Sequence, residues 1–184
     1  ATEIGCNGGT SNITNTVNGG TTPYTYEWAG GETTQNLEGV AAGNYSVTVT
    51  DNNGCTAEAS VEITQPEELT SALTAGAILC NAETINITNT VTGGTTPYTY
   101  AWAGGENSQN LENVAAGNYS VSVTDANGCT AEASVEITQP DVLTTTLTAT
   151  EIGCNGGTSD ITNTVNGGTT PYTYEWVSGE TSTT

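Results

Sequence analysis

The chain repeats itself every 74 residues, a period shared by two sets of cysteines and by one eight-residue phrase. The cysteines are Cys6, Cys80 and Cys154 in one set and Cys55 and Cys129 in the other. The phrase Gly-Gly-Thr-Thr-Pro-Tyr-Thr-Tyr begins at Gly19, Gly93 and Gly167. Such self-similarity is typical of an array of structural units, each of which contacts mainly its neighbours.

The period predicts three domains, namely repeat 1 over residues 1–66, repeat 2 over 67–140 and repeat 3 over 141–184. A unit of this size can hold one small core and is near the lower limit for independent stability. Compared with repeat 2, repeat 1 lacks an opening segment and repeat 3 lacks its last strands. Missing strands leave a sheet edge unpaired, so we expect the chain to be part of a longer protein.

The charge of the chain excludes several classes of function. There are 20 Asp and Glu residues and no Lys, Arg or His, which gives a formal net charge of −20. Nucleic-acid binding and attraction to anionic lipid both need basic side chains, so neither partner is expected. No apolar run approaches the length of a membrane span, and we expect no direct membrane insertion. The carboxylates must be solvated or bind metal ions, and a self-repelling acidic surface would keep a long array soluble.

Alternation of apolar and polar residues predicts β-strands. Within residues 45–50 and again within residues 55–64, the odd-numbered side chains are mostly apolar and the even-numbered ones polar. The turn residues Asp51-Asn52-Asn53-Gly54 separate the two segments, and the glycine can supply a left-handed backbone position. The pattern therefore predicts a β-hairpin.

Three aromatic residues are expected to lie on one face of an earlier predicted strand. Tyr24, Tyr26 and Trp28 alternate with polar residues. Aromatic side chains in this pattern favour a structural core over a ligand-binding surface. We therefore predict that Trp28 and its counterpart Trp102 are core residues.

The sequence Ala-Gly-Asn-Tyr precedes the hairpin and ends at Tyr45 in repeat 1 and Tyr119 in repeat 2. It resembles the tyrosine corner of immunoglobulin-like sandwiches, in which a tyrosine hydroxyl bonds to upstream backbone. Six or seven short strands separated by turn signals fit the same architecture. The predicted fold is all-β, a tandem array of small immunoglobulin-like β-sandwich repeats.

One inward position of the first strand is polar in every repeat, at Asn15, Asn89 and Asn163. A buried amide without a hydrogen-bond partner costs about 1–3 kcal/mol. The amide is therefore expected either to bond to a neighbouring segment or to lie in a bulge that turns it outward.

Two cysteines per repeat without any histidine favour disulfides over metal ligation. We expect bonds within repeats, Cys6 with Cys55 and Cys80 with Cys129, which leaves Cys154 unpaired. The alternative joins neighbouring repeats, Cys55 with Cys80 and Cys129 with Cys154, and leaves Cys6 unpaired. Disulfides of either kind indicate an oxidising compartment, hence an extracellular location.

The hairpin turns carry weak candidates for a metal site. Asp51 with Asn53, and Asp125 with Asn127, offer oxygen atoms, but the spacing of a helix–loop–helix calcium site is absent. An Asp side chain that caps its own turn explains the same residues. We therefore expect no cofactor, with calcium at Asp51 and Asp125 as the alternative.

Several motifs in fixed order resemble the SprB-type repeats of bacterial surface adhesins. They are Gly19 to Trp28, the run from Val40 to Asp51, Asn53-Gly54-Cys55, and Ile63-Thr64-Gln65-Pro66, with their copies in the later repeats. The resemblance implies a very large filamentous cell-surface protein of gliding bacteria that is exported by the type IX route. It implies no catalytic residues. SprB-type repeats also occur in other secreted proteins, so gliding does not follow from the repeat.

Three functions can be weighed. The first is a structural and adhesive stalk whose partners are extracellular surfaces or polysaccharide, neighbouring repeats and other copies by lateral self-association. The second is a module that binds a glycan or a protein. The third, an enzyme, is not expected, since only a carboxylate pair could act and the candidates Glu27, Glu58 and Glu62 lie on regular strands.

Overall fold

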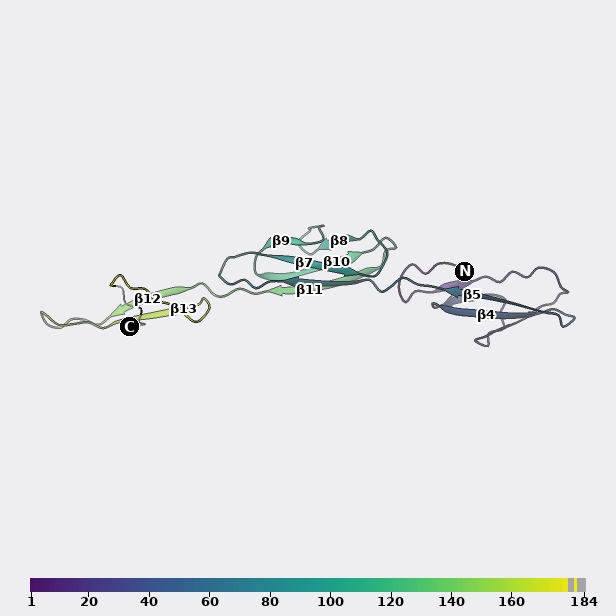
Figure 1. Cartoon of the computed structure of the whole chain (residues 1–184), viewed down its shortest axis with the longest axis horizontal. Coiled ribbons are helices and arrows are strands. Elements are labelled where there is room, and N and C mark those ends of the chain that lie inside the picture. Colours follow the sequence, from purple (N-terminus) through teal and green to yellow (C-terminus); the bar gives the residue numbers. More distant parts are fainter. Residues whose placement is uncertain (179–180, 182–184) are drawn as a thin grey trace. The chain divides into compact units, whose positions relative to one another are not determined.

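The computed structural model describes residues 1–178 and 181, and within them the protein is all-β, as predicted, without a helix. Figure 1 shows the strands. They are β1 Ser11–Ile13, β2 Thr25–Trp28, β3 Leu37–Val40, β4 Gly43–Thr50, β5 Thr56–Ile63, β6 Thr70–Ala75, β7 Ile85–Thr92, β8 Thr99–Trp102, β9 Leu111–Val114, β10 Gly117–Thr124, β11 Thr130–Ile137, β12 Thr144–Ala149 and β13 Ile161–Asn166. In the described ranges no helix is long and apolar enough to cross a membrane.

The described chain forms two compact units. The first contains Ala1–Ala72, Thr90–Ala101 and Val121–Ala133, and the second contains Leu73–Asn89, Trp102–Ser120 and Ser134–Thr184. The first unit thus joins all of repeat 1 to segments of repeat 2. The repeat boundaries drawn from the sequence stay a prediction.

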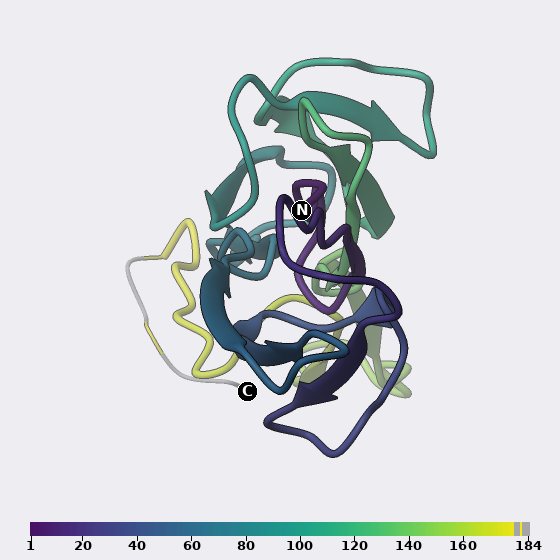
Figure 2. The ribbon, with the colours of Figure 1, turned by 90° about the vertical axis from the view of Figure 1, so that its right-hand side faces the viewer.

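Repeat 1 is a small immunoglobulin-like sandwich of two antiparallel sheets, β2-β4-β5 and β1-β3. The predicted hairpin is confirmed, because β4 pairs with β5 from Gly43↔Ile63 to Thr50↔Thr56. In Figure 1 these two strands run side by side, and Figure 2 shows the purple and blue strands of repeat 1 from the end. The core between the sheets consists of Ile4, Ile13, Trp28, Leu37, Val47, Val49 and Ile63.

The aromatic side chains combine burial with hydrogen bonding to nearby backbone. Trp28 and Trp102 are each only 4% exposed, and their indole N–H groups donate to Thr34 O and Ser108 O at 2.8 Å. A buried indole N–H needs such an acceptor. The hydroxyls of Tyr45 and Tyr119 donate to the carbonyl oxygens four residues upstream, both at 3.0 Å. This is the bond of a tyrosine corner.

Repeat 2 has the corresponding sheets, β11-β10-β8 and β6-β7-β9, with β6 as an additional strand. In repeat 3, β12 pairs with β13 from Thr144↔Asn166 to Ala149↔Ile161. The apolar side chains of this two-stranded sheet are largely open to solvent, since Leu147 is 59% exposed and Ile161 is 47% exposed.

A neighbouring segment hydrogen-bonds to the inward asparagine of each repeat, to its side chain in repeat 3 and to its backbone in repeats 1 and 2. In repeat 3 the hydroxyl of Thr145 on β12 donates to Asn163 Oδ1 at 2.5 Å. In repeats 1 and 2 the side chain of Gln35 or Gln109 donates to the backbone carbonyl oxygen of Asn15 or Asn89, at 2.9 or 3.0 Å. In repeat 1 the buried Nδ2 of Asn15 has no hydrogen-bond partner among the described residues.

Candidate functional site

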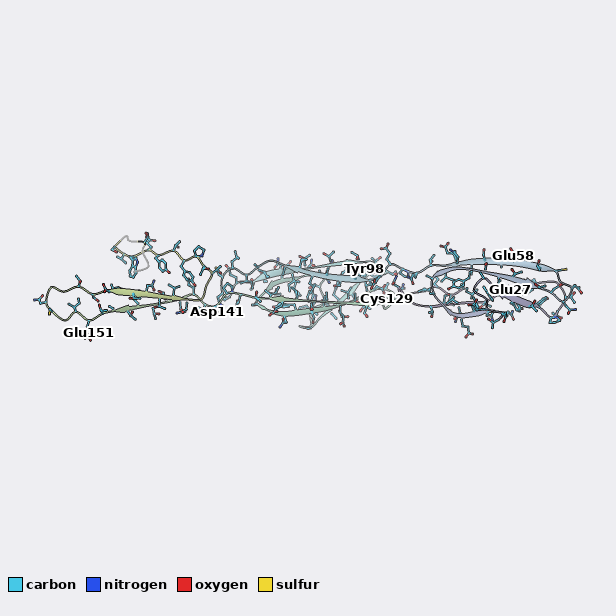
Figure 3. The ribbon with its side chains drawn as sticks, turned by 90° about the horizontal axis from the view of Figure 1, so that it is seen from below. Glu27, Glu58, Tyr98, Cys129, Asp141 and Glu151 are labelled. Atoms are coloured by element: carbon cyan, nitrogen blue, oxygen red, sulfur yellow. A yellow bond between two sulfur atoms is a disulfide. The ribbon has the colours of Figure 1, made fainter. Side chains whose placement is uncertain are left out.

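A disulfide joins Cys6 of repeat 1 to Cys129 of repeat 2, with Cα atoms 5.7 Å apart. Both residues belong to the first compact unit, and Cys129 is labelled in Figure 3. Cys55, Cys80 and Cys154 are free and exposed. The bond closes a loop of 123 positions and links neighbouring repeats covalently.

The expected pairs Cys6–Cys55 and Cys80–Cys129 are therefore wrong, and so is the alternative of Cys55 with Cys80 and Cys129 with Cys154. The physical reason is strand length. The loop after Cys6 is held at the far end of β5, whereas Cys55 immediately precedes β5. An eight-residue strand is about 26 Å long, far beyond the roughly 7 Å that a disulfide spans between Cα atoms.

We call the loop after Cys6, together with the tail Gln65-Pro66 that holds it, the socket. In repeat 1, Asn7 Nδ2 donates to Pro66 O and Gly8 N donates to Gln65 Oε1, both at 3.0 Å. These bonds connect the loop after Cys6 to the segment that follows β5. The socket therefore lies at the end of the repeat from which the chain continues into the next one.

We call the turn between β10 and β11, residues 125–129, the tip. Its Asp125 carboxylate accepts hydrogen bonds from the backbone N–H groups of Asn127 and Cys129 at 2.9 Å and of Thr95 at 2.8 Å. The tip contacts the socket through more than the disulfide, because Asn127 Nδ2 donates to Gly5 O at 2.9 Å. The carboxylate fixes the turn that presents Asn127 and Cys129.

The repeat 1 tip, residues 51–55, has the same construction. Asp51 accepts from the backbone N–H groups of Thr21, Asn53 and Cys55, each at 2.9 Å. These bonds lower the pKa of Asp51, and the bond from Thr21 has the largest effect. For Asp125 the largest single influence is burial, which raises the pKa, but the backbone N–H groups together outweigh it and the net pKa is lowered. Both carboxylates are thereby stabilised in the charged form.

The same hydrogen bonds affect whether Asp51 and Asp125 are available to bind a metal ion. Both oxygens of Asp51 and of Asp125 already accept backbone N–H groups. In the part of the chain that the structure describes, no group of three or more Cys, Asp or Glu residues could hold a metal ion. The arrangement favours turn capping, which is the role that the sequence predicts for these two residues.

A groove of about 740 Å³ runs along the tip–socket contact. The opening segment and the tail of repeat 1 line it on one side, and the tip segments of repeat 2 complete it. Its residues include Ile4, Ile63, Gln65, Thr95 and Asn127. Repeat 2 has the corresponding groove between residues 75–78 and 135–140, with a volume of about 410 Å³.

The candidate carboxylates do not form a catalytic pair. Glu27 and Glu58 lie on the two strands that flank β4, each opposite Thr48, and both are exposed (Figure 3). Strands two apart in a sheet are about 9.6 Å from each other. Glu62 is exposed four residues further along β5. Paired carboxylates of glycosidases flank a bound sugar in a cleft, and a flat exposed sheet offers no such cleft.

Sequence reasoning missed the partner of Cys6 and the role of Asn127. The missing signal was geometric, namely which end of the sandwich each cysteine occupies. The repeated Gln-Pro after β5 and the Cys-Asn pair that it holds mark one end, and the Asp-to-Cys turn marks the other.

Three solved structures illustrate what the fold is similar to. A structure described as the structural basis for Dscam isoform specificity is 16% identical over 74% of this chain and 42% of that chain, with a TM-score of 0.32. A C-terminal fragment of intimin in complex with the translocated intimin receptor is 14% identical over 72% and 54%, with a TM-score of 0.35. The N-terminal eight immunoglobulin domains of a Down syndrome cell adhesion molecule isoform are 15% identical over 97% and 34%, with a TM-score of 0.32.

The chain thus spans about half or less of the length of these structures. No curated protein matches the chain significantly in sequence. A family model does match part of it. Residues 78–107, from the segment before Cys80 to the loop after Trp102, match the SprB repeat, and this match supports the resemblance to SprB-type repeats.

Proposed function

We propose that these repeats form the structural and adhesive stalk of a large filamentous adhesin at the bacterial cell surface, with a role in surface attachment or gliding. The observation that carries the proposal is the covalent bond between successive repeats. A stalk must transmit tension, and a disulfide between repeats transmits it without relying on the weaker contacts of each small core. The SprB repeat match supports a surface location.

The bond changes the path that a pulling force takes. Tension applied at the two ends passes from Cys6 to Cys129 through the sulfur atoms, so the residues between them carry no load. An extended chain spans at most about 3.3–3.6 Å per residue. The 123 positions closed by the bond therefore hide roughly 400 Å of extensible length.

Single-molecule force spectroscopy tests this role. We expect the oxidised chain to unfold with a total extension about 400 Å shorter than that of the reduced chain. The Cys6→Ser variant should behave like the reduced chain in both conditions, and Cys154→Ser should behave like the unsubstituted chain. Equal extensions with and without reductant would contradict the load path. Antibody labelling of intact cells tests the surface location independently.

The second candidate is a module that binds glycan or protein, and the aromatic residues provide the test. Trp28 and Trp102 are buried, while Trp176 is half-buried. A Trp176→Phe variant leaves only buried indoles as reporters. Its fluorescence should not respond to polysaccharide from the natural surface, whereas a saturable change would favour a binding module. We propose no enzymatic activity, because the acidic side chains considered above lie on an open sheet.

A further inference from the structure

The last strand of repeat 1, β5, forms an open edge of its sheet. The strand order is β2-β4-β5, so among the described strands β5 pairs only with β4. It is eight residues long, whereas β2 at the opposite edge has four. Repeat 2 has the same arrangement although it has its opening strand, because β11 lies at the edge of β11-β10-β8 and β6 belongs to the other sheet. The open edge is therefore a property of the repeat.

Backbone groups along β5 point away from the sheet. Ser60 lies opposite Ser46, and the carbonyl oxygen of Ser46 accepts from Ala29 N–H, on the other side of β4, at 2.9 Å. Ser46 and Ser60 are thus a pair without mutual hydrogen bonds, whose N–H and C=O groups face opposite ways. Residues two apart on a strand repeat this direction. Glu58, Ser60 and Glu62 therefore present their backbone groups at the open edge.

The usual features that protect a sheet edge are mostly missing from β5. All eight of its residues pair with β4 without a register shift, so the strand has no bulge. Its sequence, Thr-Ala-Glu-Ala-Ser-Val-Glu-Ile, contains neither Pro nor Lys. Natural edge strands are commonly blunted by bulges, proline, lysine or short length. A long and regular edge of this kind suits the addition of another strand.

The charge on this edge decides which kind of strand fits. Glu58 and Glu62 are exposed on one face, four residues or about 13 Å apart, and so are their counterparts Glu132 and Glu136 on β11. The chain has no Lys, Arg or His, so a strand from a second copy would bring more carboxylates and no cation. Opposite charges on neighbouring strands attract and like charges repel. The edge therefore favours a partner with basic residues at alternate positions.

The groove along the tip–socket contact continues this edge. Glu62 and Thr64 line it from the β5 side, and the segment 1–4 lines it from the other. Glu3 in that segment is exposed and brings a second carboxylate to the groove. The groove of repeat 2 is likewise lined by Glu136. A strand that extends beyond the end of β5 would therefore enter an acidic groove.

We propose that the open edge of β5 binds an extended segment of another protein that carries Lys or Arg at alternate positions. The segment adds to the three-stranded sheet as a further strand. Its backbone pairs with Glu58, Ser60 and Glu62, and its basic side chains lie beside the two carboxylates. The edge of β11 offers the same site in repeat 2. The proposal does not rest on the stalk role, which the pulling experiment tests separately.

The probe is a blocked eight-residue peptide that alternates threonine and lysine, titrated into the 184-residue chain at about 0.15 M salt. Calorimetry should give one site on β5 and one on β11. Hydrogen exchange should slow at the backbone N–H groups of Glu58, Ser60 and Glu62, because these groups become hydrogen-bonded. The matched control is a peptide with the same charges and N-methylated backbone amides. It should bind at least about tenfold more weakly, because it cannot donate to the edge.

Proline variants separate strand addition from general attraction to an acidic protein. Ser60→Pro removes an N–H that does not bond to β4, and proline is tolerated where the N–H of an edge strand faces solvent. Ser60→Pro should leave only the β11 site, and its combination with Ser134→Pro should leave neither. Circular dichroism checks that the fold is retained.

Charge variants are compared in the Ser134→Pro chain, in which only β5 is open. Glu58→Gln with Glu62→Gln should weaken binding about tenfold. Glu32→Gln with Glu38→Gln removes two exposed charges elsewhere in repeat 1 and should change binding by less than about twofold.

Three outcomes would overturn the proposal. Equal binding of the N-methylated peptide, or binding without exchange protection, would mean that charge attraction alone acts. Equal losses in the two charge variants would mean that the position of the carboxylates on β5 is irrelevant. Protection of the same N–H groups at rising protein concentration without peptide would assign the edge to a second copy of the chain instead.

Discussion

The carbonyl oxygen of Glu68 occupies the position that a Cβ atom on Gly93 would need. In the same contact, Gly94 N donates to Glu67 O at 2.9 Å. Repeat 3 reproduces both features with Gly167 and Val142, and with Gly168 and Asp141. The double glycine therefore lets the segment that opens a repeat run directly against the loop before the aromatic strand.

Gly93→Ala should be far more destabilising than Gly19→Ala. Both glycines have positive φ, +70° and +79°, so each alanine is strained by roughly 1–2 kcal/mol. No atom lies within 4 Å of a Cβ at Gly19, whereas at Gly93 the backbone of Glu68 must move. We expect Gly93→Ala to lower the free energy of unfolding by at least about 3 kcal/mol and Gly19→Ala by about 1 kcal/mol.

Urea denaturation of the two variants measures this difference. Equal losses would mean that the backbone conformation alone makes glycine necessary at these positions. The contact with Glu68 would then contribute nothing to the requirement.

The hairpin, the aromatic core and the all-β class follow from short-range patterns in the sequence. Alternation fixes which side chains of residues 45–50 face inward, and Gly54 marks the turn with a φ of 85°. The tyrosine corner is equally local, because Tyr45 bonds to a residue four positions away. Such features are predictable because the residues that form them are close in sequence.

The disulfide could not be predicted in the same way, because it depends on long-range geometry. Spacing alone makes Cys55 as plausible a partner for Cys6 as Cys129 is. What decides the pairing is the hydrogen bond of Asn7 to Pro66, which places Cys6 at the far end of β5. No periodicity encodes which end of a sandwich a loop occupies, and so both pairing schemes derived from the sequence were wrong.

Removing the Cys6–Cys129 bond should destabilise the first compact unit. In the chain-entropy model a closed loop of this length restricts the unfolded chain by about 5 kcal/mol. We expect Cys6→Ser, Cys129→Ser and the double variant to lose similar amounts, because each removes the same bond. Chemical denaturation under oxidising conditions provides the measurement. Cys154→Ser is the control, and a loss in Cys6→Ser no larger than in this control would argue against the bond in solution.

Asp125→Asn should give a pH-dependent loss of stability. The folded-state pKa of Asp125 lies below the ordinary value of 3.8, so its carboxylate contributes stability above about that pH and loses it as pH falls through the folded-state pKa. The thermal midpoint of Asp125→Asn should therefore lie below that of the unsubstituted chain at pH 7. The difference between the two thermal midpoints should become smaller at acidic pH.

Asp160→Asn is the matched control for this titration, because repeat 1 carries Asn12 at the same place and Asp160 is exposed. Its midpoint should follow that of the unsubstituted chain throughout. If the difference in thermal midpoint between Asp125→Asn and the unsubstituted chain stays constant from pH 7 to pH 3, side-chain shape rather than charge stabilises the tip.

Calcium chelation should leave the thermal midpoint unchanged at fixed ionic strength. The oxygens of Asp51 and Asp125 accept backbone N–H groups at 2.8–2.9 Å, and a cation at the same oxygens would face these donors. A site filled at about 100 times its dissociation constant would contribute near 2.7 kcal/mol, which is large enough to detect. The measurement compares chelator with added calcium, and Asp51→Asn and Asp125→Asn report on each turn. A midpoint that falls on chelation in the unsubstituted chain, but not in one of these variants, would assign a calcium site to that turn.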